Sequence, residues 1–208
     1  MNDITIKERA IQVALTYVGK TEESNNDAGW LHVLMDEGGN PAHWQSREPY
    51  CISAALACFG QAYKEAGAPF PIKPSADTQI FYDNAAKAGA VIDKSETPQR
   101  GDIIIFRLGQ TIHGHAGIVT EVLEAGVRTV EFNTSPTYGG SQHEGEGCFL
   151  KYRHFDLFQN DGSDAHPAHL WIRGYVRMPE PQAETTVHDE TATGQPSAPT
   201  SPATEEHA

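Results

Sequence analysis

The segment from residue 50 to residue 66 constrains the fold of this chain more than any other. Almost every side chain in it is apolar or small, and Gly67 is positioned to end a helix. A helix that is apolar on nearly all sides must be surrounded by protein. We therefore predict that this helix lies in the middle of a domain, with the other elements packed around it.

The residue pattern along the rest of the chain predicts helices first and strands afterwards. Helical periodicity predicts further helices over residues 4–18, 29–36 and 76–88. Thr5 and Glu8 fit a capping box at the start of the first one. Strand patterns follow over residues 102–106, 116–123, 127–133, 147–152 and 170–177, with a hairpin turn at Ala125 and Gly126. Helices followed by an antiparallel sheet define the α+β class.

The chain divides into one folded domain and a tail. With 208 residues it is long enough for a single domain with a real core. We assign residues 1–178 to that domain. Residues 179–208 consist mainly of Pro, Thr, Ala, Ser, Glu and Gln, and they carry −6 of the net charge of −13. Such a composition buries too little surface to offset chain entropy, so we predict a disordered acidic tail.

Charge and hydropathy exclude several classes of partner. An acidic chain without a basic stripe argues against nucleic acid. No apolar run approaches the ~20 residues that cross a bilayer, so we expect no membrane insertion. The N-terminus lacks the basic-then-apolar order of a secretory signal. We expect synthesis in the cytoplasm and, for any action elsewhere, another route out. The pattern does not indicate an oligomeric state.

The cysteines differ in their sequence context. Cys51, Cys58 and Cys148 do not form a disulfide framework, and Cys51 and Cys58 lie about 10 Å apart along the predicted helix. All three are predicted to be free thiols. Cys58 lies in the middle of the helix, as an inert packing residue does. Cys51 follows the turn-forming residues 48–50, at the first helical turn, where unpaired N–H groups and the helix dipole favour a thiolate.

Two later segments offer partners for such a thiol. His115 opens the apolar strand Gly114-His115-Ala116-Gly117-Ile118-Val119, among small residues that leave room for a close approach. A histidine there can take a thiol proton and return it to a leaving amine. Glu131 and Asn133 lie two apart on the next strand, so both are candidates to accept the second ring N–H of His115. The order nucleophile, base and orienting group predicts a cysteine hydrolase.

Four short motifs together resemble the CHAP amidohydrolase/peptidases of the papain-like and NlpC-like group. They are Pro49-Tyr50-Cys51, the run of residues 100–106, the run of residues 114–119, and Glu131-Phe132-Asn133-Thr134-Ser135. Their order and separations are similar to those of the family, and the resemblance covers roughly residues 25–177. It implies a papain-like α+β fold in which the nucleophile starts a central helix packed on an antiparallel sheet.

The resemblance also implies roles. Cys51 would be the nucleophile and His115 the base, Glu131 and Asn133 would orient the imidazole, and the Cys51 N–H would bind the oxyanion. Candidates for a second oxyanion donor are Tyr50, Gln45 and Asn26. Family members cut peptidoglycan at the glycan–peptide amide or within the stem peptide, as in a phage lysin or a wall-degrading effector that reaches the wall after release or delivery. No cofactor is expected. No Asp-x-Asp-Gly loop precedes Cys51, so we expect no calcium requirement.

Three alternatives stay open at this point. His32-x-x-x-Asp36 followed by His113-x-His115 is the ligand pattern of zinc-dependent LytM-like endopeptidases, which also act on peptidoglycan. The domain could instead be a catalytically silent wall-binding or phage structural module. The same thiol site could also transfer or deamidate acyl groups on a protein.

Overall fold

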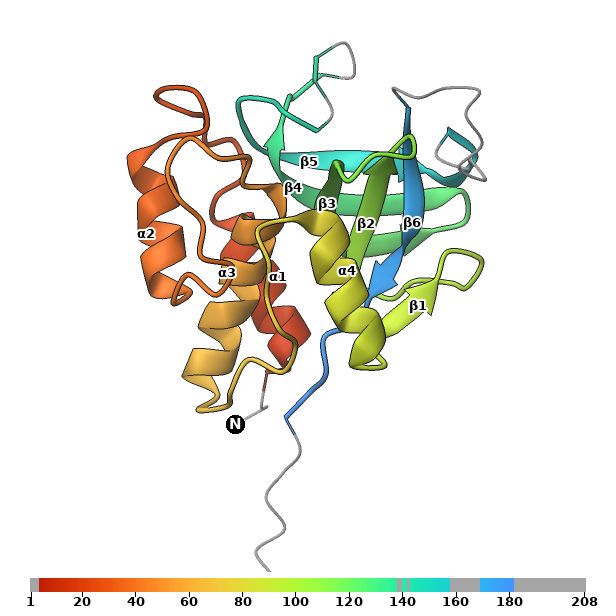
Figure 1. Ribbon diagram of the computed structural model, residues 1–208, viewed down its shortest axis with the longest axis horizontal. Helices are drawn as coiled ribbons and strands as arrows, with labels where there is room; N and C mark the ends of the chain where they lie inside the picture. The colour runs from red at the N-terminus through yellow and green to blue at the C-terminus, as the bar shows by residue number, and fades with distance from the viewer. Residues whose placement is uncertain (1–3, 138–139, 142, 158–168, 182–208) are drawn as a thin grey trace, which may run out of the picture.

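Helices precede strands in the folded part of the chain (Figure 1). The computed structural model describes residues 4–137, 140, 141, 143–157 and 169–181. The helices are α1 (Ile6–Leu15), α2 (Gly29–Glu37), α3 (Cys51–Glu65) and α4 (Thr78–Lys87). The strands are β1 (Val91–Asp93), β2 (Ile103–Leu108), β3 (Gly114–Leu123), β4 (Gly126–Thr134), β5 (Gly147–His154) and β6 (Leu170–Val176), and a 3-10 helix covers Phe155–Leu157. Among the described helices, none is long and apolar enough to cross a membrane.

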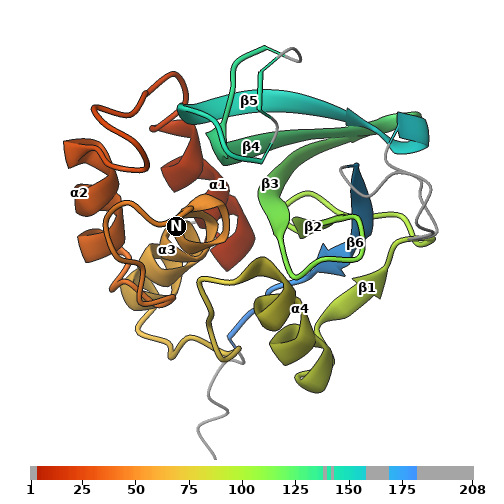
Figure 2. The same ribbon diagram turned by 45° about the horizontal axis from the view of Figure 1, so that its top comes forward.

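The strands form one antiparallel sheet in the order β1-β6-β2-β3-β4-β5. Figure 2 shows that this sheet is strongly curved, with β1 and β5 at its two edges. The predicted α+β class is therefore confirmed, and every predicted helix and strand is present with small differences at its ends. The edge strand β1 was not predicted, because three residues are too few to show an alternating pattern.

Helix α3 is the centre of the domain, as its composition predicts. Its residues from Cys51 to Gly60 are all buried, and it contacts α1 and α2 as well as strands β3 and β4. In Figure 1, α1, α2 and α3 form a group beside the sheet, while α4 lies nearer to β1 and β2. The helices approach one another closely at Gly60, where an added Cβ would run into the carbonyl oxygen of Gly38. This packing fixes where the first turn of α3 meets the sheet.

The two ends of the folded domain meet at the start of α1. The Thr5 hydroxyl accepts the Glu8 N–H at 3.3 Å, but the Glu8 carboxylate binds Arg100, so only half of the predicted capping box forms. Glu180 supplies a second cap, since its Oε2 accepts the Ile6 N–H at 2.9 Å. The Pro179 carbonyl accepts the hydroxyl of Tyr63 from α3. Residues 182–208 lie outside the described residues, so the disordered tail stays a prediction.

Candidate active site

Cys51 is the first residue of α3, as predicted, and its side chain is almost fully buried, with 4% of the residue exposed. The residue before the helix, Tyr50, offers no side-chain hydrogen bond to the first N–H groups of α3. Those donors and the positive end of the helix dipole are thus directed at the region of the thiol. Cys58 and Cys148 are also free and buried, in agreement with the absence of a disulfide framework.

His115 and Glu131 are brought together by the pairing of β3 with β4. Nε2 of His115 lies 2.8 Å from Oε2 of Glu131, and both side chains are completely buried. Glu131 pairs with Gly117, which lies two residues after His115 and therefore on the same face of β3. A Cβ on Gly117 would lie 2.6 Å from Cγ of Glu131. Glycine at this position is what lets the glutamate lie across the strand and reach the imidazole.

Asn133 lies nearby but in a different local structure. The pairing of β4 with β5 shifts register between Glu131 and Thr134, and Asn133 has a φ of +56°, in the left-handed region. The alternation that placed Glu131 and Asn133 on one face assumed a regular strand, so it does not extend through this bulge. Both amide atoms of Asn133 are buried without a hydrogen-bond partner among the described residues. Of the two candidates, Glu131 is the one that contacts His115.

The surroundings of Cys51 and His115 favour the charged form of each. Burial raises the pKa of the Cys51 thiol, but His115, the Thr78 hydroxyl and the Ile52 N–H outweigh it, so the pKa lies below its ordinary value. Burial lowers the pKa of His115, but Cys51 and Glu131 more than compensate, and this pKa lies above its ordinary value. A thiolate beside an imidazolium is the state that both shifts favour.

Glu131 is held as an ionised carboxylate. Nε of Arg153 donates to its Oε1 at 2.7 Å, and Nη2 of Arg153 donates to its Oε2. The Thr129 hydroxyl also donates to Oε1, at 2.6 Å. Burial alone raises the pKa of Glu131, but the positive charge of Arg153 and the contact with His115 hold that pKa well below its usual range. An ionised Glu131 only accepts hydrogen bonds, so Nε2 of His115 must carry the proton and donate it to this hydrogen bond.

Residues 42–134 match the family model of the CHAP domain. The chain carries a CHAP-family domain. The matched range contains Cys51, His115, Glu131 and Asn133, and CHAP domains are papain-like, in agreement with the observed fold. They are in general hydrolase or peptidase domains of the peptidoglycan-hydrolase kind. The comparison with curated proteins finds no match.

The structure also brings to the candidate site residues that the sequence did not reveal. The Thr78 hydroxyl lies 3.9 Å from Sγ of Cys51 and comes from the first turn of α4. Asp77 caps that turn by accepting the N–H groups of residues 79 and 80, and the Gln79 side chain donates to the Phe106 carbonyl at 2.9 Å. The cap is visible in the sequence, but its position against Cys51 depends on how α4 packs on the sheet. Arg153 was missed because the predicted strand ended at residue 152.

The candidates for a second oxyanion donor in this CHAP domain are reduced from three to two. The Tyr50 hydroxyl donates to Oε1 of Glu22 at 2.9 Å, so its proton is already committed. The Asn26 backbone N–H donates to the other oxygen of Glu22 at 2.7 Å, and this contact does not involve the Asn26 side chain. Gln45 is exposed in the loop before α3. Gln45 and Asn26 therefore remain as candidates.

The residues of the zinc-site alternative lie in separate places. Nε2 of His32 lies on α2, 2.6 Å from Oδ1 of Asp27, while His115 contacts Glu131. Within the ranges that the structure describes, no three His, Cys, Asp or Glu side chains are grouped closely enough to hold a metal ion. The geometry therefore gives His115 a carboxylate partner rather than a set of fellow metal ligands.

Proposed function

We propose that this CHAP domain is a thiol amidase or endopeptidase that hydrolyses amide bonds of peptidoglycan. Cys51 is the nucleophile, His115 the general base and acid, and Glu131 the residue that orients the imidazole. Two observations support this assignment: the pKa of the thiol at the start of α3 is lowered by its neighbour His115, and Nε2 of His115 lies 2.8 Å from Oε2 of Glu131. Nucleophile, base and orienting group in this order are the parts of a covalent hydrolase.

The protonation of His115 decides how the site works. Because Glu131 accepts at Nε2, that nitrogen carries a proton and Nδ1 is left to exchange a proton with Cys51. Nδ1 is buried and has no hydrogen-bond partner in the described part of the chain. Transfer of the thiol proton to Nδ1 gives the thiolate and imidazolium that the opposite pKa shifts of Cys51 and His115 favour.

The reaction then has two stages. The Cys51 thiolate attacks the amide carbonyl, a C–S bond forms, and the resulting oxyanion is stabilised by the Cys51 N–H at the start of α3. Nδ1–H of His115 protonates the leaving amine as the C–N bond breaks. Water attacks the acyl-enzyme next and gives one proton to Nδ1 as a C–O bond forms. The C–S bond then breaks, the acid product leaves, and the thiolate–imidazolium pair is restored.

Asn133 receives a different role from Glu131 in this mechanism. Its buried amide carries donors and an acceptor that no described residue uses. Such a group is usually satisfied, and the peptide unit of a bound substrate offers both an acceptor and a donor. We propose that Asn133 binds the substrate backbone beside Cys51 rather than orienting His115.

The place of action follows from the proposed substrate. The enzyme would act on the cell wall after release or delivery, in the manner of a phage lysin or a wall-degrading effector.

Purified peptidoglycan provides the test. Wild type, Cys51→Ala and, as a matched control, Cys58→Ala are incubated with it, and the released fragments are identified by mass spectrometry. Release by wild type and Cys58→Ala but not by Cys51→Ala is expected, and the fragment masses identify the bond that is cut. Equal release by all three proteins contradicts the mechanism. Loss of activity with EDTA and recovery with zinc would favour the metal alternative, and binding without release would favour the silent module.

A further inference from the structure

Arg153 is a fully buried arginine on β5 beside the proposed site. A guanidinium that is buried away from water must be paired with an acceptor. Arg153 forms the bidentate pair that is typical of arginine and a carboxylate. Its Nε donates to Oε1 of Glu131 at 2.7 Å and its Nη2 to Oε2. Oε2 is also the atom that lies 2.8 Å from Nε2 of His115. One carboxylate oxygen thus connects the arginine with the histidine.

A second contact joins Arg153 to the same histidine. The guanidinium carbon lies 5.3 Å from the centre of the Phe106 ring, within the range of a cation–π contact. His115 contacts the same ring, since its imidazole stacks on Phe106 with centroids 6.1 Å apart and an interplanar angle of 28°. Arg153 therefore supports His115 through a carboxylate and through an aromatic ring.

The charge of Arg153 determines what Glu131 can do. A buried carboxyl without a cation takes up a proton, and a protonated carboxyl no longer acts purely as an acceptor for His115. The neutral Thr129 hydroxyl, which donates to Oε1, does not replace that charge. Lys151 of β5 donates to the Ser135 carbonyl. Among the described residues, the titratable groups that act on Glu131 or His115 besides Arg153 are Cys51 of α3, Cys148 and Lys151 of β5, and His143 of the β4–β5 loop.

We propose that Arg153 is a positioning residue of the catalytic site. Its guanidinium keeps Glu131 ionised and directed at Nε2 of His115, and this leaves Nδ1 free to serve Cys51. The inference rests on the proposed thiol mechanism. It goes beyond that mechanism by assigning a fourth residue, from a strand outside the matched range of residues 42–134, to the control of the nucleophile.

The test measures the thiolate directly and needs no substrate. The rate of Cys51 alkylation by iodoacetamide is followed against pH, with peptide mass spectrometry to separate it from Cys58 and Cys148. Arg153→Met is expected to raise the pH midpoint of Cys51 alkylation by about one unit or more, because Glu131 loses its charge. Arg153→Lys keeps a charge but lacks the fork, so it is expected to give a smaller rise.

Glu131→Gln and the double variant Glu131→Gln/Arg153→Met show whether the arginine acts through the glutamate. The double variant is expected to have the same midpoint as Glu131→Gln alone, and it buries no unpaired charge. If Arg153→Met does not fold, the test uses Arg153→Lys, Glu131→Gln and the double variant instead.

Two results would overturn the inference. One is folded Arg153 variants with a lower melting temperature and an unchanged midpoint, which would leave Arg153 a purely structural role. The other is a further rise of the midpoint in the double variant. A wild-type Cys51 that reacts no faster than Cys58 and Cys148 is a separate outcome, since it overturns the proposed function itself and this inference with it.

Discussion

The two thiols of α3 show how far neighbouring groups, rather than burial, decide the chemistry of a residue. Cys51 and Cys58 lie about two turns apart on one helix, and both are buried. Burial raises the pKa of Cys58 well above its ordinary value, because the middle of the helix offers little that stabilises a thiolate. Cys51 experiences the same effect, but His115, Thr78 and the Ile52 N–H reverse it. Polar partners at the start of α3 therefore separate the proposed nucleophile from a packing residue.

Matched serine substitutions at Cys51 and Cys58 should produce the largest difference in hydrolytic activity. Cys51→Ser replaces the thiol by a hydroxyl that stays protonated, so we expect kcat/KM on peptidoglycan fragments to fall by at least about 1,000-fold. Cys58→Ser should keep activity within a few-fold of wild type, at some loss of stability. Comparable activities of the two variants would remove the distinction between the thiols.

Chemical reactivity should differ between the thiols in the unmodified protein. At neutral pH we expect Cys51 to react with iodoacetamide roughly 100-fold faster than Cys58, since the thiolate is the reactive form. Mass spectrometry of the tryptic peptides after timed quenching measures both rates in one sample. Modification of Cys58 before Cys51 would contradict the assignment.

The pH dependence of activity should reflect the lowered pKa of Cys51 and the raised pKa of His115. The thiolate forms at a pKa below that of an ordinary thiol, and the His115 proton is lost at a pKa above that of an ordinary imidazole. Activity should therefore rise at a pH below about 8.5 and fall at a pH above about 6.5, which gives a bell-shaped profile. These limits belong to the coupled pair. A single rising limb centred near the pKa of an ordinary thiol would exclude the ion pair.

The smallest effect on the reactivity of Cys51 is expected at Gly60, where α3 packs against Gly38. Gly60→Ala adds a methyl group against the Gly38 carbonyl, so we expect it to lower the free energy of unfolding by about 1–3 kcal/mol. Thermal melting measures this change, and Gln61→Ala next to it is the control that adds no atoms. The pH profile of Cys51 alkylation should stay the same in the folded variant, because the Cys51 end of α3 is held by other contacts.

The sequence predicts what depends on local pattern and leaves out what depends on packing. The all-round apolar composition of residues 50–66 is enough to place α3 in the centre and Cys51 at its start. Strand alternation locates His115 and Glu131, whose contact follows from the register of β3 and β4. The left-handed Asn133 escapes this reasoning, because a bulge interrupts the alternation.

Thr78 and Arg153 could not be predicted from the sequence for another reason. Each reaches the site from an element whose position is set by tertiary packing, so neither lies at a fixed spacing from Cys51 or His115. The alternation of side chains along β5 can place an arginine on the inner face of the sheet. It does not identify the carboxylate with which that arginine pairs.

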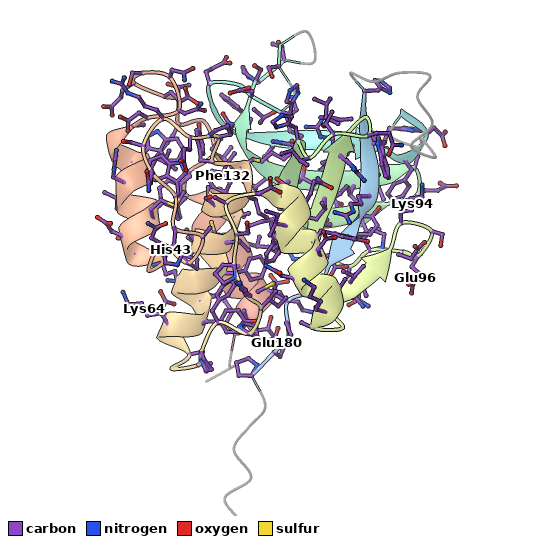
Figure 3. The ribbon with its side chains drawn as sticks, in the orientation of Figure 1. His43, Lys64, Lys94, Glu96, Phe132 and Glu180 are labelled. Carbon is purple, nitrogen blue, oxygen red and sulfur yellow. The ribbon has the colours of Figure 1, made fainter. Side chains whose placement is uncertain are left out.

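The contact of Glu180 with the start of α1 determines where the chain leaves the folded domain. In Figure 3, Glu180 lies at the bottom of the molecule, whereas Phe132, the residue between Glu131 and Asn133, lies in its upper half. Tyr63, which binds the Pro179 carbonyl, lies about 18 Å along α3 from Cys51. A fluorophore, a surface tether or a fused wall-binding module attached beyond Pro181 would thus start on the side remote from the thiol. Immobilised or retargeted forms of the protein can be built from this end without placing the attachment beside Cys51.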